Sequence, residues 1–179
     1  MLKFLKILST QRTSWLLLIL SGLLLEGCAL YFQHGMDLSP CLMCIYERVA
    51  LLGIVISGII GFIFPRFILI RLFAIIVGLF SAIKGLLLAL KHFDYQINPG
   101  PWNQCSVLAE FPTTIPLDKW IPYMFNPTGS CSDIVWSFLG YSMVQWIIFI
   151  FSCYIILFSL LLISQFKKIK QQRMIFNES

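Results

Sequence analysis

The chain has 179 residues, of which 59% are hydrophobic and only 12% are charged, and its mean hydropathy is +0.86. This composition excludes an ordinary soluble domain and indicates an integral membrane protein. The net charge of +5 comes from basic residues that flank apolar runs, so the sequence carries no footprint of nucleic-acid binding.

Four apolar runs approach the roughly 20 residues that a helix needs to cross a bilayer. The first resembles a signal peptide, and LEGC, ending in Cys28, resembles a lipoprotein cleavage site. Glu26 does not suit a cleavage box, however, and the apolar run continues past it. We therefore predict a single all-α membrane domain, a bundle of four transmembrane helices. The predicted spans cover about 15–32, 45–64, 67–90 and 146–163.

The distribution of basic residues predicts the orientation of the bundle. By the positive-inside rule, both termini are expected in the cytoplasm. The loops at about 33–44 and 92–143 then lie on the opposite side, which is oxidising and allows disulfides to persist. The basic residues on the cytoplasmic side are Lys3, Lys6, Arg12, Arg66, Arg71, Lys167, Lys168, Lys170 and Arg173, against only Lys91 and Lys119 in the opposite loops.

The segment SPCLMCIYER at 39–48 carries a CxxC motif at the start of the second span. Ser39 suits an N-cap and Pro40 the first helical position, which places Cys41 and Cys44 in the opening turns, where a helix favours a thiolate. Arg48 follows four residues after Cys44, so the pattern predicts that the two thiols and one cation share a helix face.

Two other interpretations of CxxC are half of a zinc site and a structural disulfide. Zinc would call for a second closely spaced pair, but Cys105 and Cys131 are separated by a long stretch without a histidine cluster. A bridge across two residues closes too small a loop to restrict the unfolded chain much. The motif therefore favours redox chemistry, while Cys28 and Cys153 fit small buried residues of helices.

The long loop has turn residues around each of its cysteines, in NPGPWNQC at 98–105 and NPTGSC at 126–131. Between them, a helix starting at Pro116 is predicted to lie on the membrane surface with Trp120 as its interfacial anchor. Its apolar residues follow helical spacing, at Leu117, Trp120, Ile121 and Met124. The alternative is a small packed subdomain, although about fifty residues form a poor core.

Long, ordered motifs run through most of the chain: PCxxCIYER, FPTTIPLDKWIPYMF, a later GSC and FLGYSMVQW. In these the sequence resembles DsbB, the disulfide bond formation protein B family. The resemblance implies a protein-dithiol:quinone oxidoreductase of the bacterial inner membrane. Such an enzyme reoxidises a periplasmic dithiol oxidase of the DsbA type and passes the electrons to ubiquinone or menaquinone, without a metal.

The resemblance also implies roles for six residues. Cys41 and Cys44 match the pair that passes electrons to quinone, and Cys105 and Cys131 match the loop pair that oxidises DsbA. Arg48 matches an arginine beside the quinone, and His92 matches a histidine near the same ring. Two alternatives remain: a disulfide generator with another dedicated partner, and a membrane sensor that holds a metal on four cysteines.

Two ionisable residues inside the spans have no place in the redox motifs, Glu26 in the first and Lys84 in the third. Such residues are costly in a bilayer and usually face a partner inside the bundle. Because the two lie at similar depths, we predict that Glu26 and Lys84 pair and hold the two helices in register; the alternative is that each snorkels or pairs separately.

Overall fold

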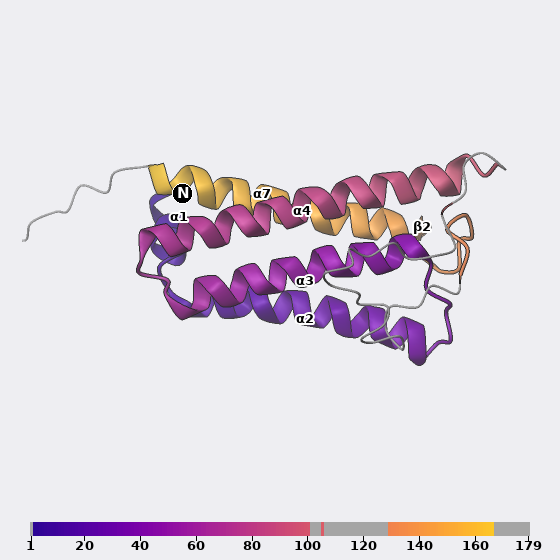
Figure 1. Cartoon of the computed structure of the whole chain (residues 1–179), viewed down its shortest axis with the longest axis horizontal. Coiled ribbons are helices and arrows are strands. Elements are labelled where there is room, and N and C mark those ends of the chain that lie inside the picture. Colours follow the sequence, from indigo (N-terminus) through magenta and orange to yellow (C-terminus); the bar gives the residue numbers. More distant parts are fainter. Residues whose placement is uncertain (1, 101–104, 106–128, 167–179) are drawn as a thin grey trace, which may run out of the picture.

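The computed structural model describes residues 2–100, 105 and 129–166. Four long helices lie side by side in an elongated bundle (Figure 1), and each is long and apolar enough to cross a membrane. This confirms the predicted all-α four-helix membrane fold. The helices are α2 (Arg12–His34), α3 (Leu42–Ile63), α4 (Ile68–Ile97) and α7 (Met143–Phe166). The predicted surface helix at Pro116 lies outside the described residues.

Helix α4 continues well past the end of its apolar run. Its 30 residues correspond to about 45 Å, whereas the hydrocarbon core of a bilayer is about 30 Å thick. The helix ends at Asn98, the C-cap residue, because a residue before proline is disfavoured in the helical conformation. Residues 92–97 therefore belong to the helix, although we predicted a loop from residue 92. His92 is buried in this part of the helix.

Helix α3 packs against both α2 and α4, and α4 packs against α7. A cluster of buried apolar residues lies between them. Two small residues of α4 allow close helix contact: a Cβ atom at Gly78 would collide with the Phe158 ring of α7, and one at Gly85 would collide with the Phe151 ring. Small residues at helix interfaces are typical of membrane bundles, and here they fix the position of α7 against α4.

A short helix, α1 (Leu2–Leu8), precedes the bundle and packs on the C-terminal part of α7. The Lys6 ammonium donates to the carbonyl of Gln165 at 3.1 Å, and the buried Arg71 guanidinium donates to the Gln165 side chain at 2.9 Å. These bonds join α1, α4 and α7 at the end of the bundle where α1 and the end of α7 lie together (Figure 1).

A small antiparallel hairpin precedes α7, formed by β1 (Ser137–Phe138) and β2 (Tyr141–Ser142). Leu139 and Gly140 make its two-residue turn with φ values of 54° and 81°, as such turns require. We did not predict this hairpin. Its side chains Phe138 and Tyr141 are exposed aromatics close to Trp146 of α7.

Candidate redox site

The cysteine motif lies at the start of α3, on backbone that pairs with a distant segment. The amide of Gly129 donates to the carbonyl of Pro40 at 3.1 Å, and Cys41 and Gly129 form an isolated parallel β-bridge. Cys41 is consequently extended, with φ −81° and ψ 166°, and serves as the N-cap. The predicted N-cap at Ser39 is wrong because this pairing keeps residues 40 and 41 out of the helix.

All four cysteines predicted to be redox-active lie in one cluster. The sulfur atoms of Cys41 and Cys44 are 2.8 Å apart, and both residues are free thiols. Cys105 and Cys131 form a disulfide. The two pairs pack together around Leu42, Met43 and Tyr95, so the Cys41–Cys44 pair and the Cys105–Cys131 pair are neighbours.

The backbone at Gly129 packs directly against the residues that precede Cys41. A Cβ atom at Gly129 would collide with the carbonyl oxygen of Ser39, which belongs to backbone that cannot rotate away. We expect Gly129→Ala to separate the two cysteine pairs and to slow disulfide exchange between them about tenfold or more, since exchange requires access of one sulfur to another.

Rapid-quench trapping of the thiols after reduction of the loop disulfide measures that rate. Gly27→Ala is the matched control, because a Cβ atom there meets nothing within 4 Å. If disulfide exchange in Gly129→Ala ran at the wild-type rate, the β-bridge between Cys41 and Gly129 would not control the contact between the two cysteine pairs.

A histidine and a glutamate lie behind Cys41. The His92 Nε2 atom is 3.4 Å from the Cys41 sulfur, and its Nδ1 atom is 3.0 Å from Glu47 Oε1. Glu47 and His92 are almost completely buried. The hydrogen bond from the Cys44 thiol, and then His92, lower the pKa of Cys41 below that of a free cysteine, although burial of the sulfur opposes this shift. Cys41 is therefore suited to react as a thiolate at neutral pH.

Sequence reasoning gave Glu47 no role. The signal was present, because a carboxylate within a membrane span is costly and usually marks a functional contact. Glu47 also follows Cys44 by three residues, which places the two on neighbouring parts of one helix surface. The position of its partner, His92, on α4 required the three-dimensional structure.

Arg48 is held by two side chains of α2. Its Nε atom donates to Glu26 Oε2 at 3.1 Å, and Nη1 donates to Gln33 Oε1 at 2.8 Å. Both members of the ion pair are buried. The predicted Glu26–Lys84 pair is wrong: Lys84 is exposed on α4, with its ammonium 5.7 Å from the centre of the Phe80 ring. The similar depths of Glu26 and Lys84 in the bundle did not predict a contact, because the Lys84 side chain points away from the bundle.

The predicted common face of Cys41, Cys44 and Arg48 is divided in the structure. Cys41 precedes the first helical residue and contacts His92 of α4. Cys44 and Arg48 instead line a cavity on the side of α2 and α7. Cys41 thus contacts His92 and Cys44 borders the cavity, while the loop disulfide packs in the same cluster as both.

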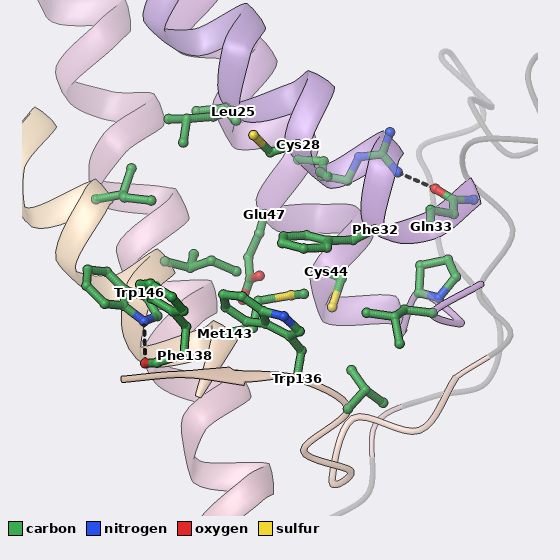
Figure 2. A pocket seen from close by; sticks show the side chains of 18 of the residues that line it. Leu25, Cys28, Phe32, Gln33, Cys44, Glu47, Trp136, Phe138, Met143 and Trp146 are labelled. Carbon is green, nitrogen blue, oxygen red and sulfur yellow. Dashed lines mark hydrogen bonds between the residues drawn. The ribbon is translucent and has the colours of Figure 1, made fainter. Parts of the chain in front are cut away.

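The cavity has a volume of about 380 Å³, within the roughly 300–1,000 Å³ of small-molecule sites. Figure 2 shows Gln33, Cys44 and Glu47 together with the aromatic residues Phe32, Trp136 and Trp146. Cys28 lines it too. The expectation that Cys28 and Cys153 are buried helix residues is wrong, because both are exposed. The remaining lining residues are Leu25, Ala29, Leu38, Ser39, Pro40, Arg48, Leu51, Val135, Phe138, Met143, Ile147, Ile150 and Phe151.

A multi-pass membrane bundle that gathers two free thiols and a disulfide at one end belongs to the class of thiol–disulfide redox proteins. The comparisons with known proteins agree. The family described as "Disulfide bond formation protein DsbB" matches residues 11–161. The chain belongs to the DsbB family, a family of disulfide-forming redox enzymes, as its motifs indicated.

Relatives match the chain over nearly its whole length. The disulfide bond formation protein B of Histophilus somni is 62% identical over 98% of this chain and 99% of its own. The protein of the same name from Pasteurella multocida is 57% identical over 99% and 100%. The protein of the same name from Haemophilus influenzae is 50% identical over 99% of this chain and 100% of its own.

Proposed function

We propose that the chain is a protein-dithiol:quinone oxidoreductase that reoxidises a periplasmic thiol oxidase of the DsbA type. The observation that carries the proposal is the cavity that has both Cys44 and Arg48 in its wall, next to a cysteine pair that packs on a second pair. This arrangement connects an apolar binding space to a route for thiol–disulfide exchange.

The residues of the cavity fit a quinone. Its walls are mainly apolar and aromatic, as a ring with an isoprenoid tail requires, and Gln33 and Arg48 supply hydrogen-bond donors at one side. Bound there, ubiquinone or menaquinone supplies an acceptor for two electrons and two protons. The fixed charge of Arg48 is suited to stabilise negative charge that develops beside Cys44.

The cysteine pairs carry the electrons in two exchanges. The two thiols of the partner reduce Cys105–Cys131, and the partner leaves as a disulfide. The reduced loop pair then reduces a Cys41–Cys44 disulfide and becomes a disulfide again. Cys41 and Cys44 release two electrons and two protons when they re-form their disulfide, and a quinone held in the cavity would accept them. Each exchange breaks one disulfide and forms another, so electrons and protons balance at every step.

His92 and Glu47 are placed to handle the proton of Cys41. His92 lies between the thiol and the carboxylate. Glu47 lines the cavity, and its Oε2 atom has no hydrogen-bond partner among the described residues. We propose that His92 accepts the Cys41 proton and that Glu47 orients the imidazole and gives the proton a path toward the cavity.

Glu47→Gln tests this proton path. The amide keeps the size and one hydrogen bond but cannot accept a proton, so we expect quinone reduction to slow about 100-fold, the lower end of general acid–base effects. Exchange between the two cysteine pairs should continue in a single turnover. Quinone absorbance and rapid-quench trapping measure the two rates.

Asp94→Asn is the matched control, since Asp94 is an exposed carboxylate of α4. It should leave both rates unchanged. Equal loss of both rates in Glu47→Gln would indicate a damaged fold in place of a blocked proton path.

We also propose the bacterial inner membrane as the location, with both termini cytoplasmic and the cysteines on the periplasmic side. Basic residues near the chain ends support this orientation. In Figure 1 the start of α1 and the end of α7 lie together, at the end opposite the hairpin.

Purified protein mixed with a quinone and reduced DsbA tests the function. We expect quinone reduction that depends on the dithiol partner and yields one partner disulfide per quinone. Turnover with another periplasmic dithiol protein but none with DsbA would favour a dedicated partner. Bound metal on four cysteines without any quinone turnover would favour the sensor.

A further inference from the structure

Three metal-ligating atoms converge at the start of α3. The sulfur atoms of Cys41 and Cys44 and a ring nitrogen of His92 all lie within 4.8 Å of one another. Cys41 and His92 are buried and Cys44 is half-buried. Two thiolates and one imidazole are a ligand set that Zn²⁺ accepts, with its fourth position left for water or another ligand.

Glu47 adds a second, independent feature of metal sites. Its carboxylate lies 3.0 Å from the other ring nitrogen of His92. Histidines that bind metals usually donate that second N–H to a carboxylate or carbonyl, which fixes the tautomer and directs the remaining nitrogen toward the metal. In this structure the remaining nitrogen is the one directed at Cys41.

We propose that the reduced Cys41–Cys44 pair and His92 bind one thiophilic cation of the Zn²⁺ class. Two thiols lose their protons and form two metal–sulfur bonds, and no electron is transferred. The sulfurs, now 2.8 Å apart, must open to about 3.8 Å for tetrahedral Zn–S bonds of about 2.3 Å. The half-buried side chain of Cys44 has room for this movement because it borders the cavity.

The metal and the disulfide exclude each other, because both use the two sulfur atoms. Only the reduced pair therefore binds the cation, and binding holds the pair reduced. If the proposed function is correct, Zn²⁺ arrests turnover after the loop pair has delivered its electrons. The metal site itself does not depend on the identity of the oxidant, so its test can succeed or fail separately.

Cobalt titration of the full-length protein in detergent tests the site. The protein is reduced, freed of reductant without oxygen, and titrated with Co²⁺. We expect one equivalent to produce thiolate-to-cobalt charge transfer and the intense visible bands of tetrahedral cobalt, and Zn²⁺ to remove both. Protein with an oxidised Cys41–Cys44 pair should give neither. Bands of equal strength in the oxidised protein would overturn the proposal.

Variants identify the ligands. Cys41→Ser and His92→Ala should lose the tetrahedral bands, while Glu47→Gln should keep them with affinity about 10- to 100-fold weaker, as expected for a residue that orients a ligand. A chain with Cys105→Ser and Cys131→Ser should bind as the parent does. Loss of cobalt binding in that chain would overturn the proposal, because it would show that the metal site uses all four cysteines.

The matched control is Cys153→Ala, which removes a free, exposed thiol that does not line the cavity. It should bind cobalt as tightly as the parent, and loss of the bands in this control would also overturn the assignment.

Discussion

Replacing Cys44 with serine should abolish quinone reduction while the loop disulfide still oxidises one equivalent of a reduced partner. A hydroxyl cannot form the disulfide with Cys41, so the electrons have no exit toward the cavity that Cys44 lines. Cys41→Ser should do the same, whereas Cys105→Ser or Cys131→Ser should abolish turnover with the partner. Quinone absorbance and a count of partner thiols in a single turnover measure the two steps.

Cys153→Ala is the control for this series, since Cys153 is an exposed free thiol of α7 and does not line the cavity. It should turn over like the parent. Mild and equal losses in all four cysteine variants would contradict a relay of two pairs.

Arg48→Ala should destabilise the protein by about 3–5 kcal/mol and also weaken quinone use. Removing the guanidinium leaves the buried Glu26 carboxylate without its ion-pair partner, which is the costly way to break such a pair. Arg48→Lys keeps the charge but loses the planar fork that bonds Glu26 and Gln33 together. We expect it to be milder and to appear mainly as a raised quinone requirement.

A double-mutant cycle separates the ion pair from the rest of the site. Glu26→Gln and Arg48→Met should each lower the free energy of unfolding, and their combination should cost less than the sum, because neither charge is then stranded. Reversible unfolding in mixed micelles measures these differences. Lys84→Met is the control and should show no coupling with Glu26→Gln. If the changes in unfolding free energy for Glu26→Gln and Arg48→Met were strictly additive, the Glu26–Arg48 pair would not be a stabilising contact.

The sequence was sufficient for the fold because bilayer thickness sets helix length directly. Four apolar runs near 20 residues can only be helices in a membrane. It was insufficient for helix ends, which depend on local contacts. Cys41 is held extended by Gly129, 88 positions away in the chain, and no spacing rule within 39–48 reports that pairing.

The site was predictable in its residues but not in its partners. CxxC, the later cysteines and Arg48 carry recognisable spacing. Glu26 was recognised as a buried charge that needs a partner, but the choice between Arg48 and Lys84 depends on which face of α4 points inward. That choice is made by packing, with Gly78 and Gly85 against α7 and Lys84 left outside.

Consecutive residues of α3 make two buried ion contacts with different helices. Glu47 reaches His92 of α4, and Arg48 reaches Glu26 of α2. Neighbouring residues of a helix differ by about 100° around its axis, so the two contacts hold α3 on different sides, and a turn of α3 about its axis would disturb both. The helix that carries Cys44 is thereby held against turning by two neighbouring helices.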